Sequence, residues 1–103
     1  MILLESADEK LGIPYLVDCD SEGNKCVVDI VTLTDKKTKS EEKVQVYISG
    51  AIHGNERVGP HAAYYLIEYL ASNFGKDDYL TWLLQAREII ITPMSNAYGF
   101  AYN

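Results

Sequence analysis

Residues 44–56 read VQVYISGAIHGNE, an apolar run that enters a glycine and continues as a polar loop. The Val, Tyr and Ile residues of 44–49 favour a β-strand. Gly50 and Gly54 allow the backbone of the following loop to make tight turns and close approaches. We therefore predict a strand over residues 44–49 that leads directly into a loop able to carry a site.

The next segment has the pattern of two helices. Pro60 stands in the first turn of the first helix, where proline is tolerated, and Gly75 is a C-terminal stop. Between them, apolar side chains recur at helical spacing at Ala63, Leu66, Ile67, Leu70 and Phe74. A second, shorter helix follows within residues 76–85, capped by Asp77 or Asp78.

Residues 87–92 contain three consecutive isoleucines and predict a strand buried on both faces. Strand, helix and strand form a βαβ unit, so this strand should run parallel to residues 44–49. Residues 13–19 and 26–34 predict two earlier strands joined by a hairpin loop, with the strands of the first half as antiparallel neighbours. The fold class is therefore α/β, with a partial mixed sheet of about four strands and two helices.

Length and composition limit the function classes. The 103 residues suffice for one core, and 48% hydrophobic with 23% charged residues is typical of a globular protein. A net charge of -6 lacks the positive field that nucleic acid or an anionic membrane surface requires. The apolar runs are also shorter than the roughly 20 residues of a membrane span. We expect neither nucleic acid nor membrane as a partner.

The cellular compartment is predicted from the N-terminus and the cysteines. The opening residues MILLE lack the basic start and apolar core of a signal peptide, so we expect a cytoplasmic location for the chain as given. Cys19 and Cys26 flank the predicted hairpin loop and could pair in an oxidising compartment. Free thiols are the favoured state in this interpretation.

His53 and Glu56 are the candidate metal ligands. In open α/β sheets, ligands gather outside the carboxyl ends of parallel strands, where residues 50–59 and 93–100 emerge. A catalytic zinc site uses imidazole and carboxylate among three protein ligands plus a water. The pair supplies two of the three. The alternative is a polar loop in which Glu56 caps the next helix and His53 is a hydrogen-bonded bystander.

Residues 44–56 resemble the strand and zinc loop of the zinc metallocarboxypeptidases, in the branch whose loop reads His-Gly-Asn-Glu. Residues 90–100, IITPMSNAYGF, are similar to the family's strand that ends in Asn-Pro-x-Gly-Tyr/Phe, with Ala97 in place of the proline. The resemblance implies that residues 1–103 are the N-terminal portion, about the first third, of a catalytic domain. It also implies a carboxypeptidase-like (phosphorylase/hydrolase-like) α/β/α fold.

The same resemblance implies specific roles. His53 and Glu56 would bind zinc with a third protein ligand that is absent from this chain, and the general base is expected downstream, so the chain itself holds no catalytic residue. The complete domain would remove C-terminal residues from peptides or proteins, and the chain alone is expected to be inactive. Arg57 is a candidate for substrate binding, against a structural or solvated role. We read His61 as a helix-start or surface residue.

Two other functions stay open. One is a zinc amidohydrolase of the aspartoacylase/succinylglutamate desuccinylase type, which acts on acylated amino acids, and the other is a non-catalytic carboxypeptidase-like module. The turn at residues 96–100 favours the peptidase.

The strand at 87–92 should have further neighbours in a complete domain, so we expect self-association or association with the missing part. We interpret one aromatic group as core packing: Tyr64, Tyr65, Tyr69, Tyr79 and Trp82.

Overall fold

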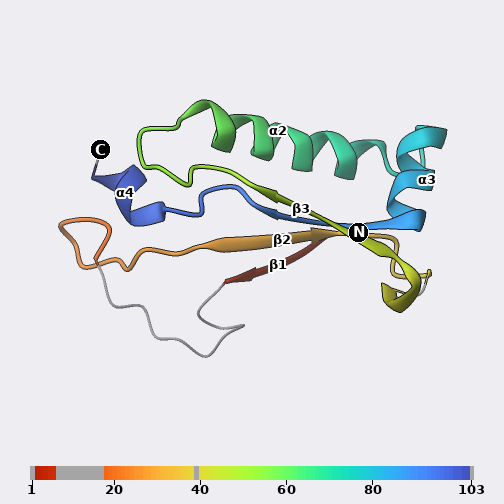
Figure 1. Cartoon of the computed structure of the whole chain (residues 1–103), viewed down its shortest axis with the longest axis horizontal. Helices are drawn as coiled ribbons and strands as arrows, with labels where there is room; N and C mark the ends of the chain where they lie inside the picture. Colours follow the sequence, from red (N-terminus) through yellow and green to blue (C-terminus); the bar gives the residue numbers. More distant parts are fainter. Residues whose placement is uncertain (1, 7–17, 39, 103) are drawn as a thin grey trace.

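The computed structural model describes residues 2–6, 18–38 and 40–102. Four strands form one mixed sheet in the order β1-β2-β4-β3. The strands are β1 (Ile2–Ser6), β2 (Asp29–Leu33), β3 (Val44–Ser49) and β4 (Arg87–Thr92). The helices are α2 (Val58–Asn73), α3 (Asp78–Ala86), the short α4 (Ala97–Ala101) and the 3-10 turn η1 (Ser40–Glu42). This arrangement confirms the predicted α/β class (Figure 1).

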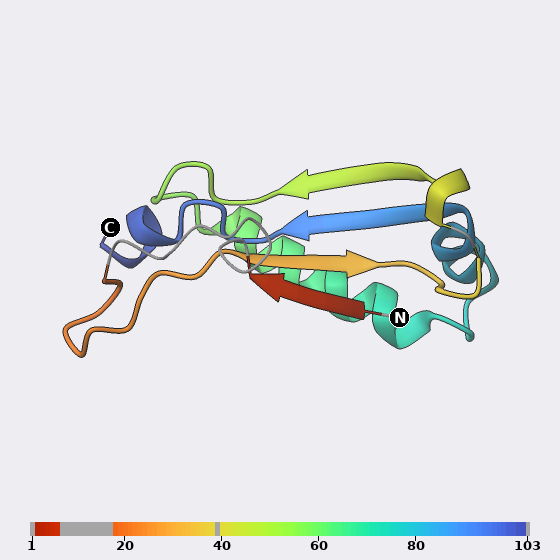
Figure 2. The same ribbon diagram turned by 90° about the horizontal axis from the view of Figure 1, so that it is seen from below.

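β3 and β4 run parallel, in a register that pairs Val44 with Arg87 and Ser49 with Thr92. β2 lies antiparallel to both β1 and β4. The carboxyl ends of β3 and β4 therefore lie at the same end of the sheet, together with α4 and the segment that precedes β2 (Figure 2). The predicted βαβ unit is confirmed, and it places the loop that follows β3 at the edge where α/β proteins bind ligands.

The core lies between the sheet and α2, which covers one face of it, and is closed by α3 at the end of the sheet where β4 begins (Figure 1). Its centre consists of Leu33 from β2, Leu84 from α3 and Ile91 from β4, all fully buried. The rest of the buried cluster comes from the same elements and α2: Val31, Ala63, Leu70, Leu80 and Ile89. Helix α3 begins at the predicted cap, because the Asp77 carboxylate accepts a hydrogen bond from the Leu80 N–H at 2.9 Å.

Several strand predictions need correction. Most of the strand predicted at 13–19 lies outside the described residues, and its described end forms only an isolated bridge between Asp18 and Lys25. Strand β1 was not predicted. β2 and β3 are not neighbours, because β4 lies between them and pairs with both. Burial on both faces is also wrong for β4, since Ile89 and Ile91 are buried whereas Ile90 on the opposite face is only half-buried.

The prediction that the aromatic group packs in the core is wrong. All five side chains lie at the surface, with exposed fractions from 44% to 69%. Small and aliphatic residues such as Ala63 and Leu70 occupy the part of α2 that packs on the sheet. The Arg87 guanidinium instead lies over Trp82, with its central carbon 5.9 Å from the centroid of the Trp82 ring. The ring of Tyr79 lies beside that of Trp82.

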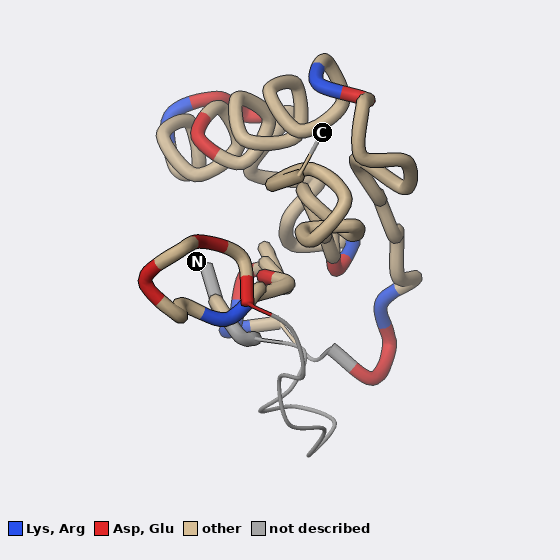
Figure 3. The backbone as a smooth tube through the Cα atoms, turned by 90° about the vertical axis from the view of Figure 1, so that its left-hand side faces the viewer, with Lys and Arg blue, Asp and Glu red and all other residues tan. Residues whose placement is uncertain are grey.

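Charged residues are dispersed along the described backbone, with Lys and Arg positions interspersed among Asp and Glu (Figure 3). One of them, Lys43, is partly buried and has a structural role. Its ammonium donates to the Thr34 hydroxyl at 2.6 Å and to the carbonyls of Asp35 and Leu84 at 2.8 and 3.2 Å. Among the described helices, none is both long and apolar enough to cross a membrane.

Candidate metal centre

The loop after β3 is held against the segment after β4 by backbone hydrogen bonds. The Gly50 N–H donates to the Thr92 carbonyl, and the Ser95 N–H donates to the Gly50 carbonyl, each at 2.9 Å. The Asn96 N–H donates to the Ala51 carbonyl at the same distance. The two segments thus continue the pairing of β3 with β4 beyond the sheet and give the loop a fixed path.

Two glycines in the loop permit close approach of the backbone. A Cβ on Gly50 would lie 2.4 Å from the Pro93 carbonyl oxygen, and a Cβ on Gly54 would lie 2.3 Å from the carbonyl carbon and oxygen of Gly99. Between them Ala51 is buried and adopts the left-handed conformation, with φ of 52°. A non-glycine residue tolerates this conformation only where its surroundings hold it. The loop is therefore packed tightly against the segment that ends in α4.

His53 and Glu56 are brought together by a tight turn. The Glu56 N–H donates to the His53 carbonyl at 3.1 Å, and the Glu56 carboxylate accepts from the His53 N–H at 2.8 Å. Nδ1 of His53 lies 3.4 Å from Oε1 of Glu56. The backbone hydrogen bond from His53, followed by the contact with its side chain, lowers the pKa of Glu56 below its ordinary value. Glu56 is therefore an ionised, acceptor-only group at neutral pH.

The geometry of this pair fits two ligands of one zinc ion. Zinc–nitrogen and zinc–oxygen bonds of about 2.0 to 2.2 Å at a tetrahedral angle place the two donor atoms about 3.4 Å apart. The observed Nδ1 to Oε1 separation is 3.4 Å, and the two side chains are 76% and 50% exposed. Within the described residues, no group of three or more His, Cys, Asp or Glu side chains is placed to hold a metal. The pair could therefore be completed only from elsewhere.

Arg57 and Asn55 line a shallow cavity of about 560 Å³ at this loop, together with Glu56 and Ser49. The guanidinium of Arg57 lies 5.5 Å from the centroid of the Phe100 ring in α4. Although Arg57 is the N-cap of α2, its side chain makes no capping hydrogen bond. The charge of Arg57 thus lies against the Phe100 ring of α4.

His61 lies apart from this cavity. It is exposed in the first turn of α2, as predicted, and lines a separate cavity of about 290 Å³. The other residues around that cavity are mostly apolar or aromatic: Pro60, Tyr64, Tyr65, Glu68, Met94 and Phe100.

Asn96 is a site residue that sequence reasoning missed. Its side-chain oxygen accepts from the Gly99 N–H at 2.9 Å and caps α4, while its Nδ2 donates to the Ile52 carbonyl at 3.2 Å. Asn followed three residues later by Gly is compatible with a helix start, and this local signal could have predicted the cap. The contact with Ile52 joins residues 44 positions apart, and no local pattern predicts it.

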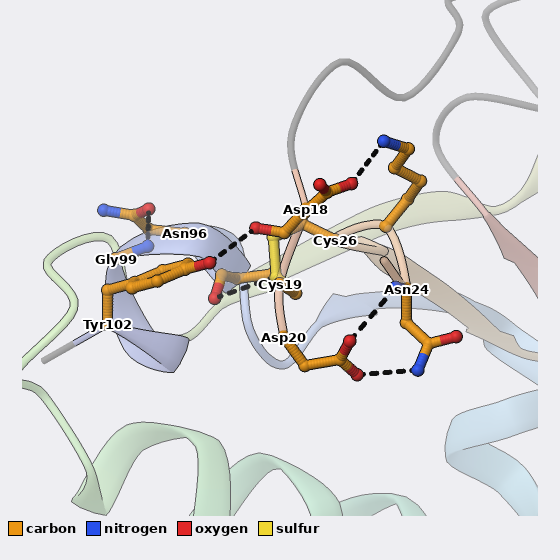
Figure 4. The surroundings of a disulfide bond; sticks show 10 residues. Asp18, Cys19, Asp20, Asn24, Cys26, Asn96, Gly99 and Tyr102 are labelled. Atoms are coloured by element: carbon orange, nitrogen blue, oxygen red, sulfur yellow. Dashed lines mark hydrogen bonds and ion pairs between the residues drawn. A yellow bond between two sulfur atoms is a disulfide. The ribbon is translucent and has the colours of Figure 1, made fainter. Parts of the chain in front are cut away.

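A disulfide joins Cys19 and Cys26, which corrects the expectation of free thiols. It closes a turn in which the Asp20 carboxylate accepts from the N–H groups of Glu22 and Asn24. This disulfide-closed hairpin lies against α4 (Figure 4). The Tyr102 hydroxyl donates to the Asp18 carbonyl at 3.1 Å, and Cys19 Sγ lies 3.9 Å from the Ala97 carbonyl oxygen. The disulfide sulfur has no hydrogen to donate, so the second interaction is a packing contact.

A mixed α/β sheet with a parallel strand that leads into a paired His–Glu loop has the architecture of a metallohydrolase domain. The solved structure of thrombin activatable fibrinolysis inhibitor (TAFI) shares this fold, with a TM-score of 0.69 over 97% of this chain and 20% sequence identity. The zinc carboxypeptidase family model matches residues 21–103. The chain belongs to the zinc carboxypeptidase family.

Curated relatives agree with this assignment over shorter stretches. Carboxypeptidase D of Anas platyrhynchos is 47% identical over 51 residues, which are 50% of this chain and 4% of that protein. Carboxypeptidase M of Mus musculus is 35% identical over 68 residues, which are 62% of this chain and 15% of that protein. The chain also covers 22% of the TAFI chain. It therefore spans a small part of the length of these relatives.

Proposed function

We propose that this chain contributes two zinc ligands, His53 and Glu56, to a metallocarboxypeptidase that removes C-terminal residues from peptides. The observation that carries the proposal is the 3.4 Å pairing of His53 Nδ1 with Glu56 Oε1 on a glycine-flanked loop at the carboxyl end of β3. Zinc, when bound, would supply a Lewis acid that polarises a carbonyl and acidifies a water molecule. The family match favours this function over the zinc amidohydrolase alternative.

The residues of this chain have distinct parts in the proposed site. Glu56 contributes a carboxylate kept ionised by the His53 N–H, and His53 contributes an imidazole nitrogen. Arg57, which lines the same cavity, is proposed to attract the substrate carboxylate, since a guanidinium matches that group with two hydrogen bonds. The third protein ligand and the general base are proposed to come from outside residues 1–103, so the chain alone should be inactive.

The two histidines provide an internal test of the zinc site. Zn²⁺ titration followed by NMR should shift the imidazole resonances of His53 and leave those of His61 unchanged. With two protein ligands the affinity should be low, and the ion should be lost on gel filtration. The variant Glu56→Gln should abolish the shift of His53, and the matched control His61→Ala should preserve it. One equivalent of zinc retained through gel filtration, or equal shifts of both histidines, would contradict the proposed ligand set.

Self-association, or association with the remainder of a carboxypeptidase domain, is proposed to use β3. The prediction assigned the exposed strand to residues 87–92, but that strand is paired on both sides, whereas β3 pairs only with β4 among the described strands. Val44 and Tyr47 of β3 are 62% and 61% exposed, so an apolar edge strand is left uncovered. Light scattering should report species larger than a monomer at high concentration, and a clean monomer would refute the association.

The cytoplasmic location remains a prediction. The Cys19–Cys26 disulfide points the other way, because such bonds persist in oxidising compartments and are rare in the cytosol. We propose to decide between the two by counting free thiols in the protein isolated from its native source under alkylating conditions. Two free thiols would support the cytoplasm, and none would support an oxidising compartment.

A further inference from the structure

Four hydroxyl groups form a continuous hydrogen-bonded row at the carboxyl ends of β3 and β4. The Tyr47 hydroxyl lies 2.7 Å from that of Thr92, which lies 3.0 Å from that of Ser95. The row ends at Ser49, whose Oγ lies 2.7 Å from Ser95 Oγ. Tyr47 and Ser49 are two residues apart on β3 and share one face of the strand, and Thr92 is the register partner of Ser49.

The number of hydroxyl hydrogens limits the hydrogen bonds that this row can donate. Each hydroxyl carries one hydrogen, so the four groups hold four donors for three mutual hydrogen bonds, and one terminal hydrogen is left over. A phenol is a better donor and a poorer acceptor than an aliphatic alcohol, so Tyr47 donates into the row. In the arrangement in which Thr92 donates to Ser95 and Ser95 donates to Ser49, the uncommitted hydrogen belongs to Ser49. The alternative acceptor for the Ser95 hydroxyl is the Thr92 carbonyl, at 3.4 Å. Hydrogen bonds arranged in a chain strengthen one another.

Ser49 is also the member of the row that lines the cavity at the loop of residues 50–59, which we call the metal loop after its proposed ligands, together with Glu56 and Arg57. We propose that Ser49 is a ligand-contacting residue that donates a hydrogen bond to a carbonyl or carboxylate oxygen bound in this cavity. The inference rests on the proposed zinc-peptidase function, and it adds a directed donor beside the cation of Arg57. Ser95, Thr92 and Tyr47 would act behind Ser49 as positioning residues.

A purely structural role explains the row less well. The link between the end of β3 and the segment after β4 is already made by the backbone, through the Gly50 N–H to Thr92 and the Ser95 N–H to Gly50. The Ser49–Ser95 side-chain bond adds no new connection between the two segments. Ser49 is also exposed, so its hydroxyl could be solvated by water without cost if it had no other partner.

The test is an NMR titration of ¹⁵N-labelled protein with N-acetylglycine, compared with uncharged N-acetylglycinamide. Wild-type amides of residues 49–59 should shift. In Ser49→Ala the dissociation constant should rise about fivefold, the effect of one neutral hydrogen bond of about 1 kcal/mol. Ser95→Ala and Tyr47→Phe, which leave the Ser49 hydroxyl in place but no longer directed, should raise it about twofold. Shifts with both probes would identify the amide carbonyl as the acceptor, and shifts with N-acetylglycine alone the carboxylate.

Two results would overturn the inference: an unchanged dissociation constant in Ser49→Ala, or shifts that avoid residues 49–59. Thermal unfolding of Ser49→Ala and Tyr47→Phe must match wild type closely, which is expected because Ser49 and Tyr47 are exposed. The Zn²⁺ titration keeps this result separate from the proposed function. Ser49→Ala should bind zinc as wild type does. If wild type binds N-acetylglycine but shows no His53 shift with Zn²⁺, the proposed zinc site is refuted and the role of Ser49 is not.

Discussion

Asn96→Asp separates the two hydrogen bonds through which the Asn96 side chain connects α4 to the metal loop. A carboxylate has the same shape as the amide and can still accept from the Gly99 N–H, so the cap of α4 is preserved. It cannot donate to the Ile52 carbonyl, and it places a negatively charged oxygen beside that carbonyl. The variant thus removes the contact to the metal loop and leaves the helix cap intact.

The expected magnitudes follow from these contacts. Loss of the Ile52 hydrogen bond should cost about 1 kcal/mol, which corresponds to a fall in Tm of about 4–8 °C for a domain near this size. Asn96→Ala loses the cap as well, worth about 1 kcal/mol more, so it should unfold at a lower temperature than Asn96→Asp. Amide hydrogens of residues 52–56 should exchange faster in both variants, because the metal loop loses the same contact in each.

The assay is hydrogen exchange measured by NMR, combined with thermal unfolding followed by circular dichroism. Asn73→Asp is the matched control. Asn73 Nδ2 donates to the Tyr69 carbonyl at 2.8 Å on α2, so the same chemical change occurs away from the metal loop. That control should leave exchange at 52–56 unchanged. Unaltered exchange at 52–56 in Asn96→Asp, or an Asn96→Ala variant as stable as Asn96→Asp, would refute the division of roles between the two side-chain atoms.

Two further substitutions test the supports of the loop. In Gly54→Ala the new Cβ would lie 2.3 Å from the Gly99 backbone, so α4 must move. This variant should lose about 1–3 kcal/mol of stability and the NMR response of His53 to Zn²⁺. The control Gly75→Ala, at φ of 83° with no neighbour within 4 Å, should cost about 1 kcal/mol and keep that response. Replacement of Cys19 and Cys26 by serine opens a loop of sequence separation 7 and should lower stability by about 2–3 kcal/mol by chain entropy, seen as a lower denaturation midpoint in urea. An unchanged midpoint would show that the disulfide does not stabilise the hairpin.

The βαβ unit could be predicted because its signals are local. Pro60, Gly75 and Asp77 punctuate the chain at the positions where the helices begin and end. The apolar spacing between them reports the helical period directly. The order of strands in the sheet could not be predicted in this way, because it depends on contacts between distant segments. No feature of residues 29–33 or 44–49 indicates that residues 87–92 will be placed between them.

The aromatic residues illustrate a second limit. Helical spacing indicates that residues share a face, but it does not say which face meets the sheet. In α2 the buried positions are occupied by Ala63 and Leu70, whose small or flexible side chains join the buried cluster that contains Ile89 and Ile91. Tyr64, Tyr65 and Tyr69 are left on the flanks. The acceptors of Lys43 show the same limit, because they come from the distant α3 as well as from the nearby residues 34 and 35.

The candidate site likewise has a part that follows from local sequence and a part that depends on distant contacts. The His53–Glu56 pairing spans three residues and is closed by a local turn, so the sequence pattern places the two side chains close together, and their role as zinc ligands stays a prediction. The supports of that turn come from distant parts of the chain: Asn96 and Gly99 contact the loop directly, and the disulfide-closed hairpin lies behind α4. These contacts depend on how α4 folds back over the sheet edge. Ala97, which replaces the family proline, leaves this arrangement intact because the cap is made by the Asn96 side chain.

These distant supports hold the backbone of the metal loop. Backbone pairing, the glycine contacts and Asn96 fix the loop against the segment after β4 and against α4, while the His53 and Glu56 side chains stay exposed. A loop fixed in this way loses little conformational entropy when a further ligand arrives, so binding energy is not spent on ordering the first two ligands. The same loop without that ligand has two donors open to water and competes poorly for zinc. The affinity of the complete site should therefore exceed that of this chain by far more than one additional bond would suggest.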